Sequence, residues 1–221
     1  GAPVEKLRIG FLDHRPLAGD IDHECVEGVH IVAKQLEQLG HIVDASWPTA
    51  LEDASFPPRF TAIWGTNMSV ACETTAALLG REVTSEDFEL VNWTMAQYAK
   101  NTSATTYASA ILATSHYRRA VAQWWADGWD ILVTPTVSRV PLKVGQFAND
   151  PKDPMKPMKV AGDFVAFTAA FNTSGQPAIS LPLHWTPEGV PIGIQLVAAY
   201  GREDILLRLA AQLDPYEAEQ S

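Results

Sequence analysis

The residues with the clearest potential for chemistry lie in one predicted helix near the N-terminus. His23, Glu27 and His30 are spaced at i, i+4 and i+7, and Asp20 precedes them. Their side chains would share one helix face and could converge on a metal ion. The same spacing is typical of the solvated stripe of an amphipathic helix. We favour the solvated stripe, and we expect neither a metal nor a cofactor.

The serines offer a second kind of chemistry, nucleophilic catalysis, but no catalytic motif surrounds them. The sequence contains no Gly-x-Ser-x-Gly, no Ser-x-x-Lys and no phosphate-binding Gly-rich loop of the Walker type. Ser174 stands beside Gly175, which is more typical of a tight turn between a helix and a strand than of a nucleophile. We therefore assign no catalytic residue in this chain.

Composition limits the classes of partner. The 221 residues carry 16 Lys and Arg against 26 Asp and Glu, a formal net charge of −10, with 47% hydrophobic and 19% charged residues. This balance predicts a globular protein and disfavours nucleic acid as a partner, because acidic surfaces repel phosphate backbones. No apolar run reaches the roughly 20 residues that span a bilayer, so we expect no membrane partner and a cytoplasmic location. Cys25 and Cys72 are expected to be buried free thiols.

The hydrophobic periodicity predicts an α/β fold. Residues 7–12 alternate like a strand, the next segment has helical periodicity from an N-cap at Asp22 to Gly40, and 41–45 predict a second strand. Such a βαβ unit implies parallel strands. A helical segment is expected over 58–128, in which Gly80 ends one helix and a capping box at 84–87 starts another. The elements expected after it are a buried strand 130–135, a Pro-rich loop 141–160, a helix 161–171, antiparallel strands 178–181 and 192–197, and a last helix.

We therefore expect a mixed, mainly parallel β-sheet flanked by helices. Residues 1–6 are predicted to be a leader, and 7–221 a single domain. The segment 162–171 carries no charge after Asp163 and ends in the polar run Asn172 to Gly175. That composition is typical of a ligand-pocket wall, but a plain core helix followed by a turn explains it as well and is favoured on spacing alone.

Several segments together resemble one known family. Residues 167–182, followed by Gly-Val-Pro-Ile-Gly-Ile-Gln-Leu-Val at 189–197, closely resemble the C-terminal part of amidase signature hydrolases. The run Asp-Ile-Leu-Val-Thr-Pro-Thr at 130–136 is similar to the buried strand and Thr-Pro-Thr loop of that family. Residues 7–11 and 36–41 resemble the strand and helix that open the second half of such enzymes. The resemblance covers essentially the whole chain, in the same order.

The resemblance implies a hydrolase whose nucleophile lies elsewhere. The family uses a lysine, a serine held by a cis peptide and a nucleophilic serine in a Gly-Ser-Ser-Gly-Gly type stretch of its N-terminal half, and this sequence has no such stretch. The chain would then be the C-terminal part of an amidase. It would require the N-terminal catalytic portion of the same protein to act on a small-molecule amide, and would be inactive alone. A non-catalytic ligand-binding module is the alternative, and a homo-oligomer stays open.

The resemblance also implies a substrate-pocket wall. In relatives, one face of the helix before the Asn-x-x-Gly-x-Pro stretch lies against the acyl group, and here that face carries Gly162, Val165 and Ala169. Relatives that act on charged aminoacyl groups can place an acid seven residues before the Asn, where this chain has Val165. We therefore predict an uncharged, apolar acyl group, with Trp64 as a further contact. Asn172, Gly175 and Pro177 are predicted to form a structural loop.

Overall fold

A computed structural model describes residues 4–213 of the chain. These residues form two compact units. The first, called the sheet unit, comprises 4–52, Arg118–Leu142 and 164–213. The second, called the helical unit, comprises Asp53–Tyr117 and Lys143–Asp163. The predicted single domain over 7–221 stays a prediction, and residues 1–3 of the predicted leader and 214–221 lie outside the described residues.

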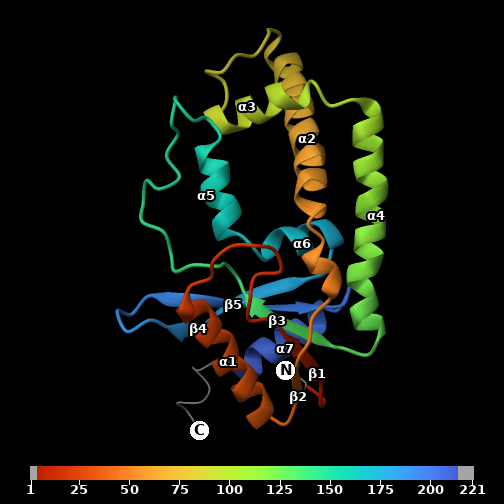
Figure 1. Cartoon of the computed structure of the whole chain (residues 1–221), viewed down its shortest axis with the longest axis vertical. Helices are drawn as coiled ribbons and strands as arrows, with labels where there is room; N and C mark the ends of the chain where they lie inside the picture. Colours follow the sequence, from red (N-terminus) through yellow and green to blue (C-terminus); the bar gives the residue numbers. More distant parts are fainter. Residues whose placement is uncertain (1–3, 214–221) are drawn as a thin grey trace. The chain divides into compact units, whose positions relative to one another are not determined.

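The sheet unit is built on five strands in the order β2-β1-β3-β5-β4 (Figure 1). The strands are β1 (Arg8–Phe11), β2 (Ile42–Ala45), β3 (Ile131–Pro135), β4 (Ala178–Trp185) and β5 (Pro191–Ala198). β1 pairs in parallel with β2 and β3, whereas β5 pairs antiparallel with β3 and β4. The predicted mixed α/β sheet is confirmed, with its described pairings divided evenly between the two directions.

Two helices cover one face of this sheet. They are α1 (His23–Gln38) and α7 (Glu203–Leu213), and both contact β4 and β5. Buried side chains of α1 and α7, such as Leu36 and Leu209, form one apolar core with alternate strand residues such as Ile9 and Ile194. Because strand side chains alternate between faces, Gly10 faces the other side, where a Cβ would overlap the ring of Trp124 and the carbonyl oxygen of Ser46.

The start of α1 is tied to the loop after β3. Asp22 is the N-cap residue, as predicted, but its carboxylate makes no hydrogen bond to the helix. The Asp22 Oδ2 instead accepts a hydrogen bond of 2.9 Å from the backbone N–H of Val140. The Asp22 N–H donates to the carbonyl of Ser138 at 2.8 Å. The loop that follows β3 is thus held against the N-terminus of α1.

The remaining helices vary widely in length. A short 3-10 helix spans Thr49–Glu52, and the α-helices are α2 (Phe56–Leu79), α3 (Leu90–Ala99), α4 (Ala104–Ala126), α5 (Lys156–Phe164) and α6 (Thr168–Ser174). The division between the units falls within α4 and at the end of α5. The prediction of a Pro-rich loop over 141–160 is wrong for its last residues, because the chain is helical from Lys156, with Pro157 in the first turn, where a missing N–H costs little. No described helix is long and apolar enough to cross a bilayer.

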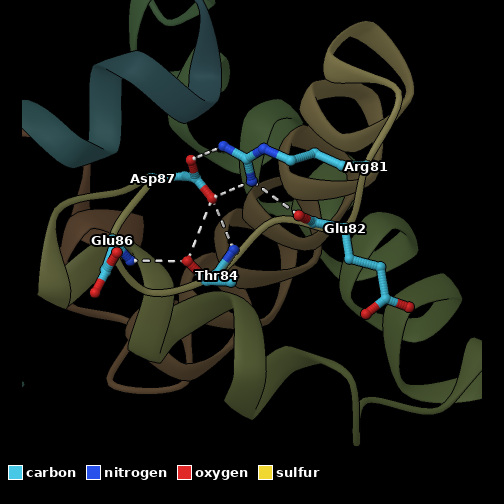
Figure 2. Close-up of polar contacts among 5 residues, drawn as sticks. All are labelled: Arg81, Glu82, Thr84, Glu86 and Asp87. Atoms are coloured by element: carbon cyan, nitrogen blue, oxygen red, sulfur yellow. Dashed lines mark hydrogen bonds and ion pairs between the residues drawn. The ribbon is translucent and has the colours of Figure 1, made fainter.

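The turn between α2 and α3 differs from its prediction. Gly80 ends α2 in the left-handed conformation, with φ of 65°, as expected. The pattern at 84–87 forms a turn rather than a helix start, because Arg81 holds the Asp87 carboxylate through hydrogen bonds of 2.9 and 2.6 Å (Figure 2). The same carboxylate accepts the Thr84 N–H at 2.9 Å. The next helix begins only at Leu90.

The helix predicted over 161–171 is interrupted. The structure ends α5 at Phe164 and begins α6 at Thr168. The carbonyl of Phe164 accepts a hydrogen bond of 3.0 Å from the backbone N–H of Ser138 instead of continuing the helical ladder. Phe167, at the N-cap of α6, is only 3% exposed. Tertiary contacts therefore bend the chain where the sequence contains no glycine or proline.

Candidate functional site

The predicted pocket wall does not lie on one helix. Gly162 is in the last turn of α5, Val165 lies in the break, and Ala169 is in the first turn of α6. The spacing of i, i+3 and i+7 therefore does not place these residues on one helical face, which corrects the geometry that we expected. Gly162 has open space where a Cβ would be, and Val165 is 37% exposed. Both positions are accessible to a ligand, and neither carries charge.

The predicted structural loop forms the junction between α6 and β4. α6 extends through Asn172 to Ser174, and Gly175 ends it in the left-handed conformation with φ of 85°. This conformation strains any residue with a Cβ, which explains the glycine. The carbonyl of Pro177 then accepts the N–H of Ala198 at 3.1 Å, which starts the pairing of β4 with β5. Gly175 and Pro177 thus lie in the connection between α6 and β4, whereas the prediction of a loop is wrong for Asn172, which lies in α6.

The serines near this junction lack the geometry of nucleophiles. Ser174 is buried, and its Oγ has no hydrogen-bond partner among residues 4–213. The Oγ of Ser180 lies 2.6 Å from the Oγ1 of Thr136. A serine nucleophile needs a base within hydrogen-bond reach, and a threonine hydroxyl is not one. Neither serine is therefore arranged for catalysis in the described part of the chain.

Small polar side chains gather on the face of the sheet opposite α1 and α7. Gln195 donates to the Thr134 Oγ1 at 3.0 Å, and Thr134 donates to the carbonyl of Pro135 at 2.8 Å. Next to them, a Cβ on Gly193 would lie 2.9 Å from the Ser180 Oγ and 3.0 Å from the Thr136 Oγ1. The hydroxyls of Thr136 and Ser180 therefore form a compact pair beside the backbone of Gly193. Sequence reasoning missed this pair, because its two members lie 44 residues apart in the chain.

The helical unit contains two shallow hollows beside α2. One, of about 520 Å³, is lined by hydroxyl-bearing residues such as Ser103 and Thr106 and by Arg59, whose guanidinium lies 3.2 Å from Asp53. The other, of about 360 Å³, is lined mainly by apolar residues that include Met95 and Met155. An uncharged apolar lining fits an uncharged acyl group better than the hydroxyl-rich one. Both hollows share Pro58 and Ala62.

Trp64 lies in α2 but does not line either hollow. Its ring tilts against Phe60, with the ring centroids 5.7 Å apart, and the side chain is partly buried. Phe60 in turn contacts Phe56, whose ring stacks on Tyr117 at 4.6 Å. Trp64 thus belongs to an aromatic row, and its role as a substrate contact stays a prediction.

The two cysteines are free and buried, as expected. Burial, together with the nearby carboxylates of Asp22 and Glu24, raises the pKa of Cys25 to about 11. Burial also raises the pKa of Cys72. Because the thiolate is the reactive form, neither cysteine is prepared to act as a nucleophile at neutral pH.

The polar stripe of α1, whose spacing fits a metal site but is interpreted as a solvated face, separates into pairs. His30 lies 3.1 Å from Asp13, and His23 lies 3.5 Å from Glu27. A contact that the sequence did not predict joins Glu24 to His184 of β4, with the carboxylate Oε2 2.8 Å from the Nε2. His23, Glu27 and His30 are thus exposed side chains in two separate pairs, as a solvated stripe requires.

Comparison with known proteins places this fold in a family. The sequence profile of the family described as Amidase matches residues 2–207. The 6-aminohexanoate-cyclic-dimer hydrolase of Paenarthrobacter ureafaciens is 38% identical over 215 residues, which cover 94% of this chain and 43% of that protein. The putative amidase AmiC of Mycobacterium tuberculosis strain H37Rv is 33% identical over 217 residues, covering 96% of this chain and 44% of that protein.

The solved structures agree with the sequence comparison. A structure of 6-aminohexanoate cyclic dimer hydrolase superposes with a TM-score of 0.86 at 38% identity, covering 94% of this chain and 44% of that one. The chain therefore spans a little under half the length of the relatives that it matches. The matched region contains all five described strands, the Thr-Pro-Thr loop after β3 and the junction between α6 and β4. The chain belongs to the amidase family.

Proposed function

We propose that this chain is the C-terminal portion of a serine amidase that hydrolyses a carboxylic amide to a carboxylate and ammonia or an amine. The family match over 2–207 carries this proposal, together with relatives of which the chain covers 43% and 44%. The reaction would proceed through an acyl-enzyme, formed by a serine of the N-terminal catalytic portion and hydrolysed by water. This chain would supply part of the substrate pocket.

The segment 162–169 is the part of the chain that we assign to the acyl group. It offers open space at Gly162 and an exposed, uncharged side chain at Val165. An uncharged wall favours an uncharged acyl group, because a buried charge without a partner is costly. The 38% identical relative is named for a cyclic dimer of 6-aminohexanoate. In a cyclic dimer, the amine and carboxyl ends are joined as amides, so such a substrate carries no charge.

We therefore propose that uncharged aliphatic amides, cyclic ones included, are the substrate class. The test uses the full-length protein with matched amides whose acyl groups are aliphatic, acidic or cationic. Val165→Asp should lower kcat/KM for the aliphatic amide by at least about tenfold, since a charge in an apolar pocket disfavours an apolar group. Val144→Asp is the control, because Val144 is fully exposed in the loop before α5. A preference of the unaltered protein for charged acyl groups would contradict the assignment.

The isolated 221-residue chain is expected to hydrolyse no amide. Ser174 and Ser180 lack a base, and no residue of the chain is assigned as a nucleophile. Turnover by the purified chain, with a serine-reactive reagent bound to Ser174 or Ser180, would overturn this expectation. Mass spectrometry of the native protein tests the larger proposal. A precursor with an upstream Gly-Ser-Ser stretch supports the amidase, and a mature protein of the mass of this chain supports a binding module.

A further inference from the structure

A mixed group of metal-ligating side chains lies where α1 contacts the edge strand β4. Glu24 and Glu27 come from the first two turns of α1, and His184 comes from β4. One ligand atom from each of the three residues lies within 4.8 Å of the other two. All three residues belong to the sheet unit. An imidazole and two carboxylates therefore converge from two elements that are far apart in sequence.

The fold places the imidazole of His184 by two local features. The register of β4 against β5 shifts between Pro182 and His184, and such an irregularity turns a side chain toward a different face of the sheet. α1 carries a glycine at the contact, where a Cβ on Gly28 would lie 3.1 Å from the His184 Cβ and 2.8 Å from the Ile194 Cδ1. The helix thus approaches the strand closely, and the His184 side chain is only 12% exposed.

The charges around this group favour a cation. Within residues 4–213, every ion pair of Glu24 and Glu27 is with a histidine, Glu24 with His184 at 2.8 Å and Glu27 with His23 at 3.5 Å. Two carboxylates so close repel each other unless a positive charge lies between them. No lysine or arginine in that range forms an ion pair with either carboxylate. A divalent ion would supply the missing charge.

We propose that Glu24, Glu27 and the Nε2 of His184 bind one divalent transition-metal ion of the zinc type. Imidazole nitrogen and carboxylate oxygen are zinc ligands, and two ligands about 2 Å from a tetrahedral zinc lie roughly 3.3 Å apart. The Glu24 Oε2 and the His184 Nε2 are 2.8 Å apart as hydrogen-bonding atoms, and they would move slightly apart to hold the ion. Glu27, with its side chain 46% exposed, has the freedom to rotate toward the other two. Water completes the coordination on the open side.

The ion would join α1 to the edge strand β4 and so stabilise the sheet unit. The site is independent of the amide hydrolysis proposed above, because none of its three residues belongs to the segment 162–169. It also differs from the stripe of His23, Glu27 and His30, since only Glu27 is common to both. The proposed site is more than a group of exposed carboxylates in the first turns of a helix, because the imidazole of His184 comes from β4.

Zinc binding to the chelator-treated 221-residue chain tests the proposal. Isothermal titration with zinc chloride should show one ion per chain, and zinc should raise the Tm. His184→Asn and Glu27→Gln should each weaken zinc binding by about tenfold or more and remove the rise in Tm. His30→Asn is the matched control, because His30 is a histidine of α1 that pairs with Asp13 at 3.1 Å. The control should bind zinc like the unaltered chain.

Each outcome decides the proposal. Glu27→Gln keeps the test valid if His184→Asn does not fold, since Glu27 is largely at the surface. The proposal is overturned if the unaltered chain binds no zinc or if Glu27→Gln binds it as tightly as before. A loss of binding in His30→Asn equal to that in Glu27→Gln would also overturn it, because zinc would then bind the exposed histidines of α1 nonspecifically.

Discussion

The two compact units of this chain bury their helices to different extents. In the sheet unit, the 16-residue α1 buries six residues along one stripe. In the helical unit, the 24-residue α2 buries only three, Phe56, Gly65 and Cys72. Four threonine hydroxyls of α2 donate hydrogen bonds to backbone carbonyls one turn earlier in the same helix. The four residues are Thr61, Thr66, Thr74 and Thr75. The sheet unit is therefore specified by its own core, whereas α2 satisfies its hydroxyls locally and contributes little to a core.

Both units expose apolar side chains, and Leu207 of the sheet unit is 66% exposed. In the helical unit, Leu78 is 83% exposed and Leu112 is 60% exposed. The difference between the units lies in the buried residues of their helices, and the sheet unit has the more developed core of its own. We expect the helical unit to depend more on its surroundings.

The largest expected effect comes from truncating the core of the sheet unit. Leu209→Ala removes a fully buried side chain of α7 and should lower the free energy of unfolding by about 2–5 kcal/mol. Leu207→Ala on the same helix, where the side chain is 66% exposed, should change it by less than about 0.5 kcal/mol. Leu78→Ala in the helical unit should behave like Leu207→Ala. Urea denaturation measures all three, and a cost for Leu78→Ala equal to that for Leu209→Ala would break the comparison.

The next effect comes from adding a methyl group at two glycines. Gly10→Ala would force a Cβ into the Ser46 carbonyl and the Trp124 ring, and should destabilise the sheet unit by about 1–3 kcal/mol. Gly162→Ala of the helical unit meets open space within a helix, and should stabilise the chain by about 0.5–1 kcal/mol. Thermal denaturation measures both changes. Equal destabilisation by the two substitutions would show that α5 is packed more tightly than its surroundings indicate.

A third effect concerns association. We expect the isolated chain to self-associate at high protein concentration, because it exposes apolar side chains and the edge strands β2 and β4. Leu78→Glu combined with Leu112→Glu should lower the average mass in sedimentation experiments. Leu207→Glu in the sheet unit serves as the control and should lower it less. A clean monomer of the unaltered chain at high concentration would refute the expectation.

The smallest effect concerns two aspartates, one in each unit, of which Asp204 is exposed and Asp87 is partly buried. Hydrogen bonds from Arg81 hold the pKa of Asp87 well below its ordinary value of 3.8 (Figure 2). Hydrogen bonds from Arg202, and to a smaller extent from Arg208, lower the pKa of Asp204 to about 2. Each carboxylate therefore stabilises the folded state fully above pH 3.8, and this contribution is lost as the pH falls toward the folded-state pKa. Because Arg81, Arg202 and Asp204 are exposed to solvent, the gain from each pair is small.

Carboxyl titration by NMR checks this prediction. Arg81→Ala should return the pKa of Asp87 toward 3.8 and leave Asp204 unchanged. Arg202→Ala should raise the pKa of Asp204 and leave Asp87 unchanged. An Asp87 that titrates near 3.8 in the unaltered chain would show that the turn in Figure 2 is not held by Arg81 in solution.

The strands and the core of the sheet unit were predictable from sequence because their patterns are local. The alternating residues 7–12 form β1, and the apolar run at 130–135 forms β3. The predicted βαβ unit corresponds to the parallel pairing of β1 with β2. The break at 165–167 was not predictable. It depends on the carbonyl of Phe164 bonding to Ser138, which lies 26 residues earlier in the chain.

The candidate sites show the same limit. The family resemblance, rather than periodicity, indicated the pocket segment and its lack of charge at Val165. The hydroxyl pair of Thr136 and Ser180 and the contact of Glu24 with His184 join residues 44 and 160 positions apart. No local pattern in the sequence marks either contact. The capping pattern at 84–87 was misread for a related reason, since Arg81 lies outside the pattern and binds Asp87.

The close contact of Gly28 with His184 has a consequence for the evolution of this chain. A methyl group at position 28 would press on the Cβ of His184 and on Ile194, so we expect positions 28 and 184 to vary together. Relatives that carry a larger residue at position 28 are expected to have a smaller one at 184, or a helix displaced from the strand. Pairs of substitutions at 28 and 184 would then be inherited together, and a chimera that mixes α1 and β4 from different lineages should fold poorly.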